Sequence, residues 1–129
     1  MKTLLLLALP LVLAASAAAG APLGLDRAAS PDTVPDIAGF QGRIHREGRV
    51  YVAGQPGADA LRTLAARGLV AVVNLRTPAE VADRERVPFD EPALADSLGL
   101  AYVPIPLGGS DHPYTPAAVD SFAAILDRY

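Results

Sequence analysis

A short apolar run with β-branched residues at its centre occupies residues 69–76, Leu-Val-Ala-Val-Val-Asn-Leu-Arg, and ends in polar side chains. A run of this length and composition is typical of a strand buried on both faces. Helical patterns flank it on both sides, so we expect it inside a parallel sheet and not at the rim. Asn74 and Arg76 then lie at the carboxyl end of the strand, where open parallel sheets bind their ligands.

Strand and helix patterns alternate along the rest of the chain from residue 37 onward, which predicts an α/β fold with a parallel-rich sheet and flanking helices. Pro104 favours a sheet edge or a strand end for the last strand. The final helix is expected to place Val119, Phe122 and Leu126 on the sheet. The predicted strands are residues 49–54, 69–75 and 100–105, and the predicted helices are residues 58–67, 77–86, 91–98 and 117–128.

Several residue types mark where these helices begin and end. Thr77, followed by Pro78 and Glu80, has the pattern of a capping box, and Asp90 and Thr115 precede the next two helices as possible caps. Gly68 and Gly99 stand where helices commonly stop. The alternation ends on a helix, so a further strand is expected after it and the fold is expected to be C-terminally incomplete.

The first 19 residues have the pattern of a secretory signal peptide. Lys2 precedes an apolar run from Leu4 to Leu13, and residues 15–19 fit A-x-A cleavage sites. A membrane anchor would need about 20 apolar residues, so we expect a cleaved leader, no stable membrane anchor, and a periplasmic or secreted protein. Residues 20–36 lack any period and are predicted to be a flexible lead-in to a domain that spans residues 37–129.

Composition limits the possible chemistry. Without Lys2 the chain carries ten arginines against 14 acidic residues, and no basic run, which argues against a nucleic-acid partner. The sequence contains no cysteine, so the chain has neither disulfides nor a thiolate nucleophile. His45 and His112 are the only histidines and lie far apart in sequence, so no metal or other cofactor is expected.

Arg76 is the candidate contact for an anionic ligand because it ends the central strand. The same guanidinium could instead pair with Glu80 or Asp83 on the following helix, and arginine serves both uses. Asn74 is more often a residue that closes a turn than one that binds ligand.

Four segments in order carry a resemblance to a known family. They are residues 51–56 (Tyr-Val-Ala-Gly-Gln-Pro), 68–69 (Gly-Leu), 72–76 (Val-Val-Asn-Leu-Arg) and 98–106 (Leu-Gly-Leu-Ala-Tyr-Val-Pro-Ile-Pro). Over residues 38–129 the chain resembles the dual-specificity-phosphatase-like proteins of bacteria. It is similar in particular to the branch related to the phosphatase-like domain of the β-lactamase hydrolase-like proteins.

The resemblance implies a cysteine-phosphatase fold acting on a phosphorylated substrate. In that family a cysteine begins a phosphate-binding loop and an arginine follows five residues later, with the loop amides around the anion. This chain has no cysteine. The family's general acid is an aspartate on a loop, and Asp111 stands at about that place, although a loop aspartate can also serve only to turn the chain.

Three interpretations remain open at this point. The chain is an exported phosphatase-like protein that is inactive as it stands, or a non-catalytic module that binds phosphorylated or anionic ligands, or a structural domain that binds a partner. We expect the first.

The leader pattern predicts that the exported protein begins near Ala18 or Gly20. N-terminal sequencing of the protein recovered from the periplasm or the medium checks this expectation. Recovery of a cytoplasmic product that still begins at Met1 would contradict it.

Overall fold

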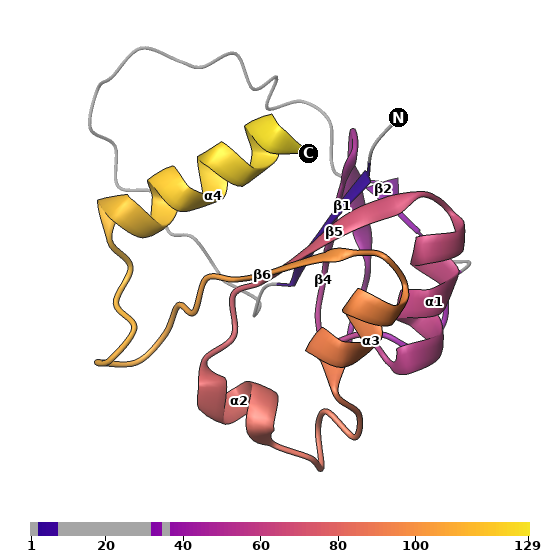
Figure 1. Ribbon diagram of the computed structural model, residues 1–129, viewed down its shortest axis with the longest axis horizontal. Coiled ribbons are helices and arrows are strands. Elements are labelled where there is room, and N and C mark those ends of the chain that lie inside the picture. The colour runs from indigo at the N-terminus through magenta and orange to yellow at the C-terminus, as the bar shows by residue number, and fades with distance from the viewer. Residues whose placement is uncertain (1–2, 8–31, 35–36) are drawn as a thin grey trace.

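Figure 1 shows the computed structural model, a mixed and mostly parallel sheet with helices on both faces. The structure describes residues 3–7, 32–34 and 37–129. The strands are β1 (Thr3–Leu7), β2 (Asp32–Thr33), β3 (His45–Glu47), β4 (Val50–Ala53), β5 (Leu69–Asn74) and β6 (Ala101–Pro104). The helices are α1 (Ala58–Ala66), α2 (Pro78–Ala82), α3 (Glu91–Ser97) and α4 (Pro116–Arg128).

The strand order across the sheet is β2-β3-β4-β1-β5-β6. β4, β1, β5 and β6 are parallel, whereas β3 pairs antiparallel with both β2 and β4. The expected α/β class is therefore confirmed, and so is the position of the apolar run inside the sheet, because β5 has a parallel neighbour on each side. Pro104 ends the outermost strand β6, as its missing amide hydrogen requires.

The local signals at the helix ends are also confirmed. Thr77 and Glu80 form a complete capping box at the start of α2, and the side chains of Asp90 and Thr115 accept hydrogen bonds from backbone amides of α3 and α4. Gly68, which follows α1, has a φ of +90°, a conformation that an L side chain rarely adopts.

Two apolar cores lie on opposite faces of the sheet. On one face α1 and α3 pack through Leu61, Leu64 and Ala95 against Tyr51 and Val72 of the strands. On the other face α4 covers Ala71, Val73 and Ile105. Every residue of β5 except Val70 is buried, because this strand supplies side chains to both cores.

The packed face of α4 differs from the expected one. Phe122 and Leu126 contact the sheet as expected, but Val119 is 63% exposed and its place is taken by Ala118, Ile125 and Tyr129. The helix has two overlapping apolar stripes, one that includes Val119 and one that includes Ala118 and Ile125, and Phe122 belongs to both. The rotation of the helix about its axis decides which stripe faces the sheet.

Part of the expected leader and of the expected lead-in lies in the sheet. Thr3–Leu7 is β1, and Asp32–Thr33 pairs with β3 as the edge strand β2. The expected cleavage sites at residues 15–19 and most of the lead-in lie outside the described residues. Within the described segments, no helix has the length and apolar character that crossing a bilayer requires.

Val73 tests the assignment of β5 to the core, because its side chain is fully buried. Val73→Asp buries a carboxylate without a partner, so we expect it to lower the free energy of unfolding by about 4 kcal/mol or more. Val119→Asp is the matched control on the exposed side of α4 and should change stability by less than about 0.5 kcal/mol. Urea unfolding of both variants provides the measurement, and a Val73→Asp protein as stable as the control would contradict the assignment.

Candidate functional site

Polar side chains converge where the parallel strands end. Gln55 follows β4, Asn74 is the last residue of β5, and Tyr102 lies in the neighbouring strand β6. Glu91 opens α3, which packs beside these strand ends. Because the carboxyl ends of parallel strands meet at one edge of the sheet, the four side chains from four separate elements form a single cluster.

Close packing positions Gln55 in this cluster. Gly54 lies so close to the chain that a Cβ atom built on it would fall 2.0 Å from the carbonyl oxygen of Gln41. The backbone amide of Gln41 donates to the carbonyl of Gln55 at 2.9 Å, which holds the two segments together. Only glycine allows this approach, so residue 54 determines where the amide side chain of Gln55 can reach.

Glu91 is the centre of the cluster and is only 1% exposed. Its carboxyl group accepts hydrogen bonds from Gln55 Nε2 at 3.2 Å, Asn74 Nδ2 at 2.8 Å and the Tyr102 hydroxyl at 3.3 Å. Burial raises the pKa of Glu91, and the three donors only partly offset the loss of water around the carboxylate. A carboxyl group in such surroundings takes up a proton more readily than one on the surface.

Tyr102 donates to Glu91 and stays protonated. Burial, together with the nearby Glu91 carboxylate, raises the pKa of Tyr102 to about 12. The phenol oxygen also accepts a hydrogen bond from Asn74 Nδ2 at 2.7 Å. Asn74, Tyr102 and Glu91 are therefore each hydrogen-bonded to the other two. The cluster is therefore fully hydrogen-bonded, which is the condition under which a buried polar group is tolerated.

Arg76 lies next to this cluster and forms neither of the ion pairs considered from sequence. Its guanidinium donates to Gln55 Oε1, and its backbone amide donates to Asn74 Oδ1 at 2.9 Å. The second bond confirms that Asn74 closes the turn after β5. In addition, Asn74 binds Glu91, a role that the turn pattern did not predict.

The two acidic residues that could have neutralised Arg76 have other partners. The Glu80 carboxylate accepts from the Thr77 amide at 2.9 Å and the Thr77 hydroxyl at 2.8 Å, and these bonds hold the pKa of Glu80 below its usual value. Asp83 pairs with Arg86 at 3.4 Å. Among the described residues, Arg76 forms no ion pair with an acidic side chain.

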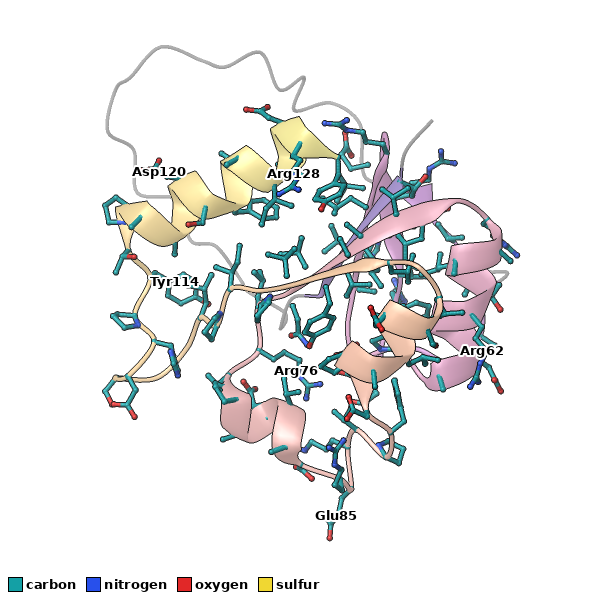
Figure 2. All side chains as sticks on the ribbon, in the orientation of Figure 1. Arg62, Arg76, Glu85, Tyr114, Asp120 and Arg128 are labelled. Carbon is teal, nitrogen blue, oxygen red and sulfur yellow. The ribbon has the colours of Figure 1, made fainter. Side chains whose placement is uncertain are left out.

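Arg76 lines a pocket with a volume of about 370 Å³. Figure 2 shows the labelled Arg76 in the space between α2 and α3, away from Arg62 on α1. The pocket lies within the size range of small-molecule sites, which is about 300–1,000 Å³. Its wall includes Asn74 and Tyr102 of the cluster, the charged residues Arg84 and Asp90, and Pro78, Val81, Ala82, Pro92, Pro104 and Pro106.

Asp111 lies in a second hollow of about 400 Å³, formed by the loop of residues 108–112 and the start of α2. The side chain is exposed, and its carboxylate accepts a hydrogen bond from the Ser110 hydroxyl at 3.2 Å. Pro78 lines both hollows. The two sequence candidates therefore occupy neighbouring hollows with a common wall, and Asp111 does not line the pocket of Arg76.

The two histidines are distant in the sheet order. His45 lies in β3, and His112 follows β6, which is separated from β3 by the three strands β4, β1 and β5. Within the described part of the chain, no three His, Cys, Asp or Glu side chains lie together as metal ligands would.

Sequence reasoning missed Glu91, Gln55 and Tyr102 as a joint site. One signal in the sequence could have found Gln55, because it directly follows a predicted parallel strand. Glu91 begins a predicted helix and Tyr102 lies inside a predicted strand, so neither carries such a signal. The pairing of the strands across the sheet, which the sequence does not specify, is what makes them neighbours.

In comparisons with known proteins, no protein-family model, no curated protein and no solved structure matches the chain.

Glu91 should make stability depend on pH. A carboxyl group whose pKa is raised by folding contributes stability that is present below its unfolded pKa and is lost as pH rises through its folded pKa. Above the ordinary glutamate pKa of 4.5 we therefore expect the native protein to lose stability relative to Glu91→Gln as pH increases. Urea unfolding over a pH series measures this difference.

Glu85→Gln is the control, because Glu85 is exposed on the loop after α2 and labelled in Figure 2. Its stability profile should run parallel to that of the native protein. A parallel profile for Glu91→Gln would show that the buried carboxyl group does not titrate differently on folding.

Proposed function

We propose that the pocket beside Arg76 binds a small anionic group, and that a phosphate monoester is its ligand class. The observation that carries this proposal is the state of the Arg76 guanidinium. It is half-buried just after the carboxyl end of β5, lines a pocket of about 370 Å³, and pairs with no acidic side chain among the described residues. Arginine presents a planar fork of donors that matches carboxylate and phosphate oxygens.

The surroundings of Arg76 support an anion. Arg84 and Asp90 line the same pocket, and the Arg84 guanidinium donates to the carbonyl of Phe89 at 2.6 Å. Asp90 Oδ1 already accepts from the amide of Ala93 at 3.0 Å as the cap of α3. Glu91 lies buried beside the pocket, and its carboxyl group is held by hydrogen bonds from Gln55, Asn74 and Tyr102.

We further propose that the domain is phosphatase-like, in the cysteine-dependent superfamily that the sequence resembles. The support is the order of the four resembling segments together with a mostly parallel sheet and flanking helices. Without cysteine, these 129 residues cannot form a phosphocysteine. The function proposed for the chain itself is therefore that of an exported protein that binds a phosphorylated ligand without hydrolysing it.

Asp111 is proposed as the residue that would face the leaving-group side of such a ligand. It lies in the hollow next to the pocket, across Pro78. It lies exposed on a loop, which is where the general acid of the resembled family stands. In a chain that does not hydrolyse its ligand, this residue should affect binding only slightly.

Titration of the full chain with phenyl phosphate, followed by calorimetry or by NMR shifts, tests the site. Arg76→Ala removes the proposed charged donor, so we expect affinity to fall by about 10- to 100-fold, the range for a charge-assisted hydrogen bond. Arg76→Lys keeps the charge but loses the fork, and should give an intermediate loss.

Arg62→Ala is the matched control, because Arg62 pairs with Asp59 at 2.8 Å on the outer side of α1, far from the pocket. It should bind phenyl phosphate as the native chain does. Equal affinities for the Arg76→Ala and Arg62→Ala proteins, with both folded, would contradict the proposed site. Turnover of p-nitrophenyl phosphate by the native chain would contradict the proposed absence of hydrolysis.

A further inference from the structure

The strand at the centre of the sheet comes from the segment that the sequence predicts to be an export leader. Thr3–Leu7 lies between β4 and β5 and runs parallel to both. Leu4 stands opposite Val50 on one side and Ala71 on the other, and its amide donates to the carbonyl of Arg49 at 2.8 Å. One short segment thus holds together two strands that share no hydrogen bonds with each other.

The side chains of this strand enter both cores. Leu4 is 1% exposed and packs with Ala71 and Val73 on the face that α4 covers. Leu5 is fully buried and packs with Tyr51 and Val72 on the opposite face. A fit of this kind needs an extended, uncharged segment with alternate residues directed to opposite faces.

The position between β4 and β5 that β1 occupies, called the slot below, has a fixed width. Neighbouring strands lie about 4.8 Å apart, so β4 and β5 are roughly 10 Å apart and cannot pair directly. Without a strand between them, their inward-facing backbone amides and carbonyls would have no partner inside an apolar core, which is costly.

We propose that the slot between β4 and β5 is a strand-binding site and that its occupant is the chain's own leader segment, Thr3–Leu7. This segment then has two uses that exclude each other. As part of a leader it must be extracted for export, and as β1 it completes the sheet. Folding of the full chain therefore competes with export, and removal of the leader empties the site.

Hydrogen exchange of the full chain tests the occupancy directly. The protein is made by cell-free synthesis without signal peptidase, and intact mass verifies that Met1 is retained. Amides of residues 4–7 should exchange on the order of 100-fold more slowly than the same amides in the isolated leader peptide. Exchange at the rate of the isolated peptide would overturn the proposal.

Cross-linking tests the register by an independent route, and the test and control pairs share the same Leu4→Cys change. The chain has no cysteine, so a Leu4→Cys and Ala71→Cys pair forms an intramolecular disulfide without competition from native thiols. These residues are Cα partners on neighbouring strands, about 4.8 Å apart, which lies within the range that a disulfide spans. We expect rapid oxidation of this pair.

The control pair is Leu4→Cys with Ala101→Cys. Ala101 is the partner of Ala71 on the far side of β5, so it lies two strand spacings, about 10 Å, from Leu4. That separation exceeds disulfide reach, and this pair should oxidise at least about 10-fold more slowly. Equal rates for the two pairs would show that Thr3–Leu7 does not occupy the slot in this register.

Discussion

The backbone ladders on the two sides of β1 are the interactions on which the rest of the structure depends. β4 and β5 belong to one strand–helix–strand unit, but they are separated by a full strand width that only β1 fills. The two faces of β1 also join the cores, since Leu4 and Leu5 pack on opposite sides. Burial of both ladders and both side chains makes this strand the least replaceable part of the sheet.

The buried Glu91 cluster also joins separate elements, at the end of the sheet where the parallel strands have their carboxyl ends. Its hydrogen bonds join the ends of β4 and β5 to the start of α3 and to β6, so the pocket wall is built from fixed strand ends. Burying a charged carboxylate is unfavourable, and for this reason burial raises the pKa of Glu91. The same arrangement leaves the Arg76 guanidinium bonded to an uncharged amide, that of Gln55, and in no ion pair within the described part of the chain.

The function proposed for this site is anion binding, which requires fewer groups than phosphoryl transfer does. Two arginines line a pocket of suitable size, whereas Asp111 lies in the adjacent hollow and the sequence offers no thiolate. Anion binding needs only preorganised positive charge and donors, which fixed strand ends supply. Transfer of a phosphoryl group needs in addition a nucleophile within reach, and the described residues bring none of the cysteine type to the pocket.

Local signals in the sequence determined most of the elements. β5 follows from its apolar run, α2 from the Thr77 capping box, and the ends of α1 and α3 from their glycines, because each depends on neighbours within a few residues. Tertiary structure alone decided three other features: the insertion of Thr3–Leu7 as the central strand, the choice of Ala118 and Ile125 over Val119 on α4, and the meeting of Glu91 with Gln55, Asn74 and Tyr102. Each of these depends on contacts between segments far apart in the chain. Hydrophobic period and capping patterns carry no information about which distant segment will be the neighbour.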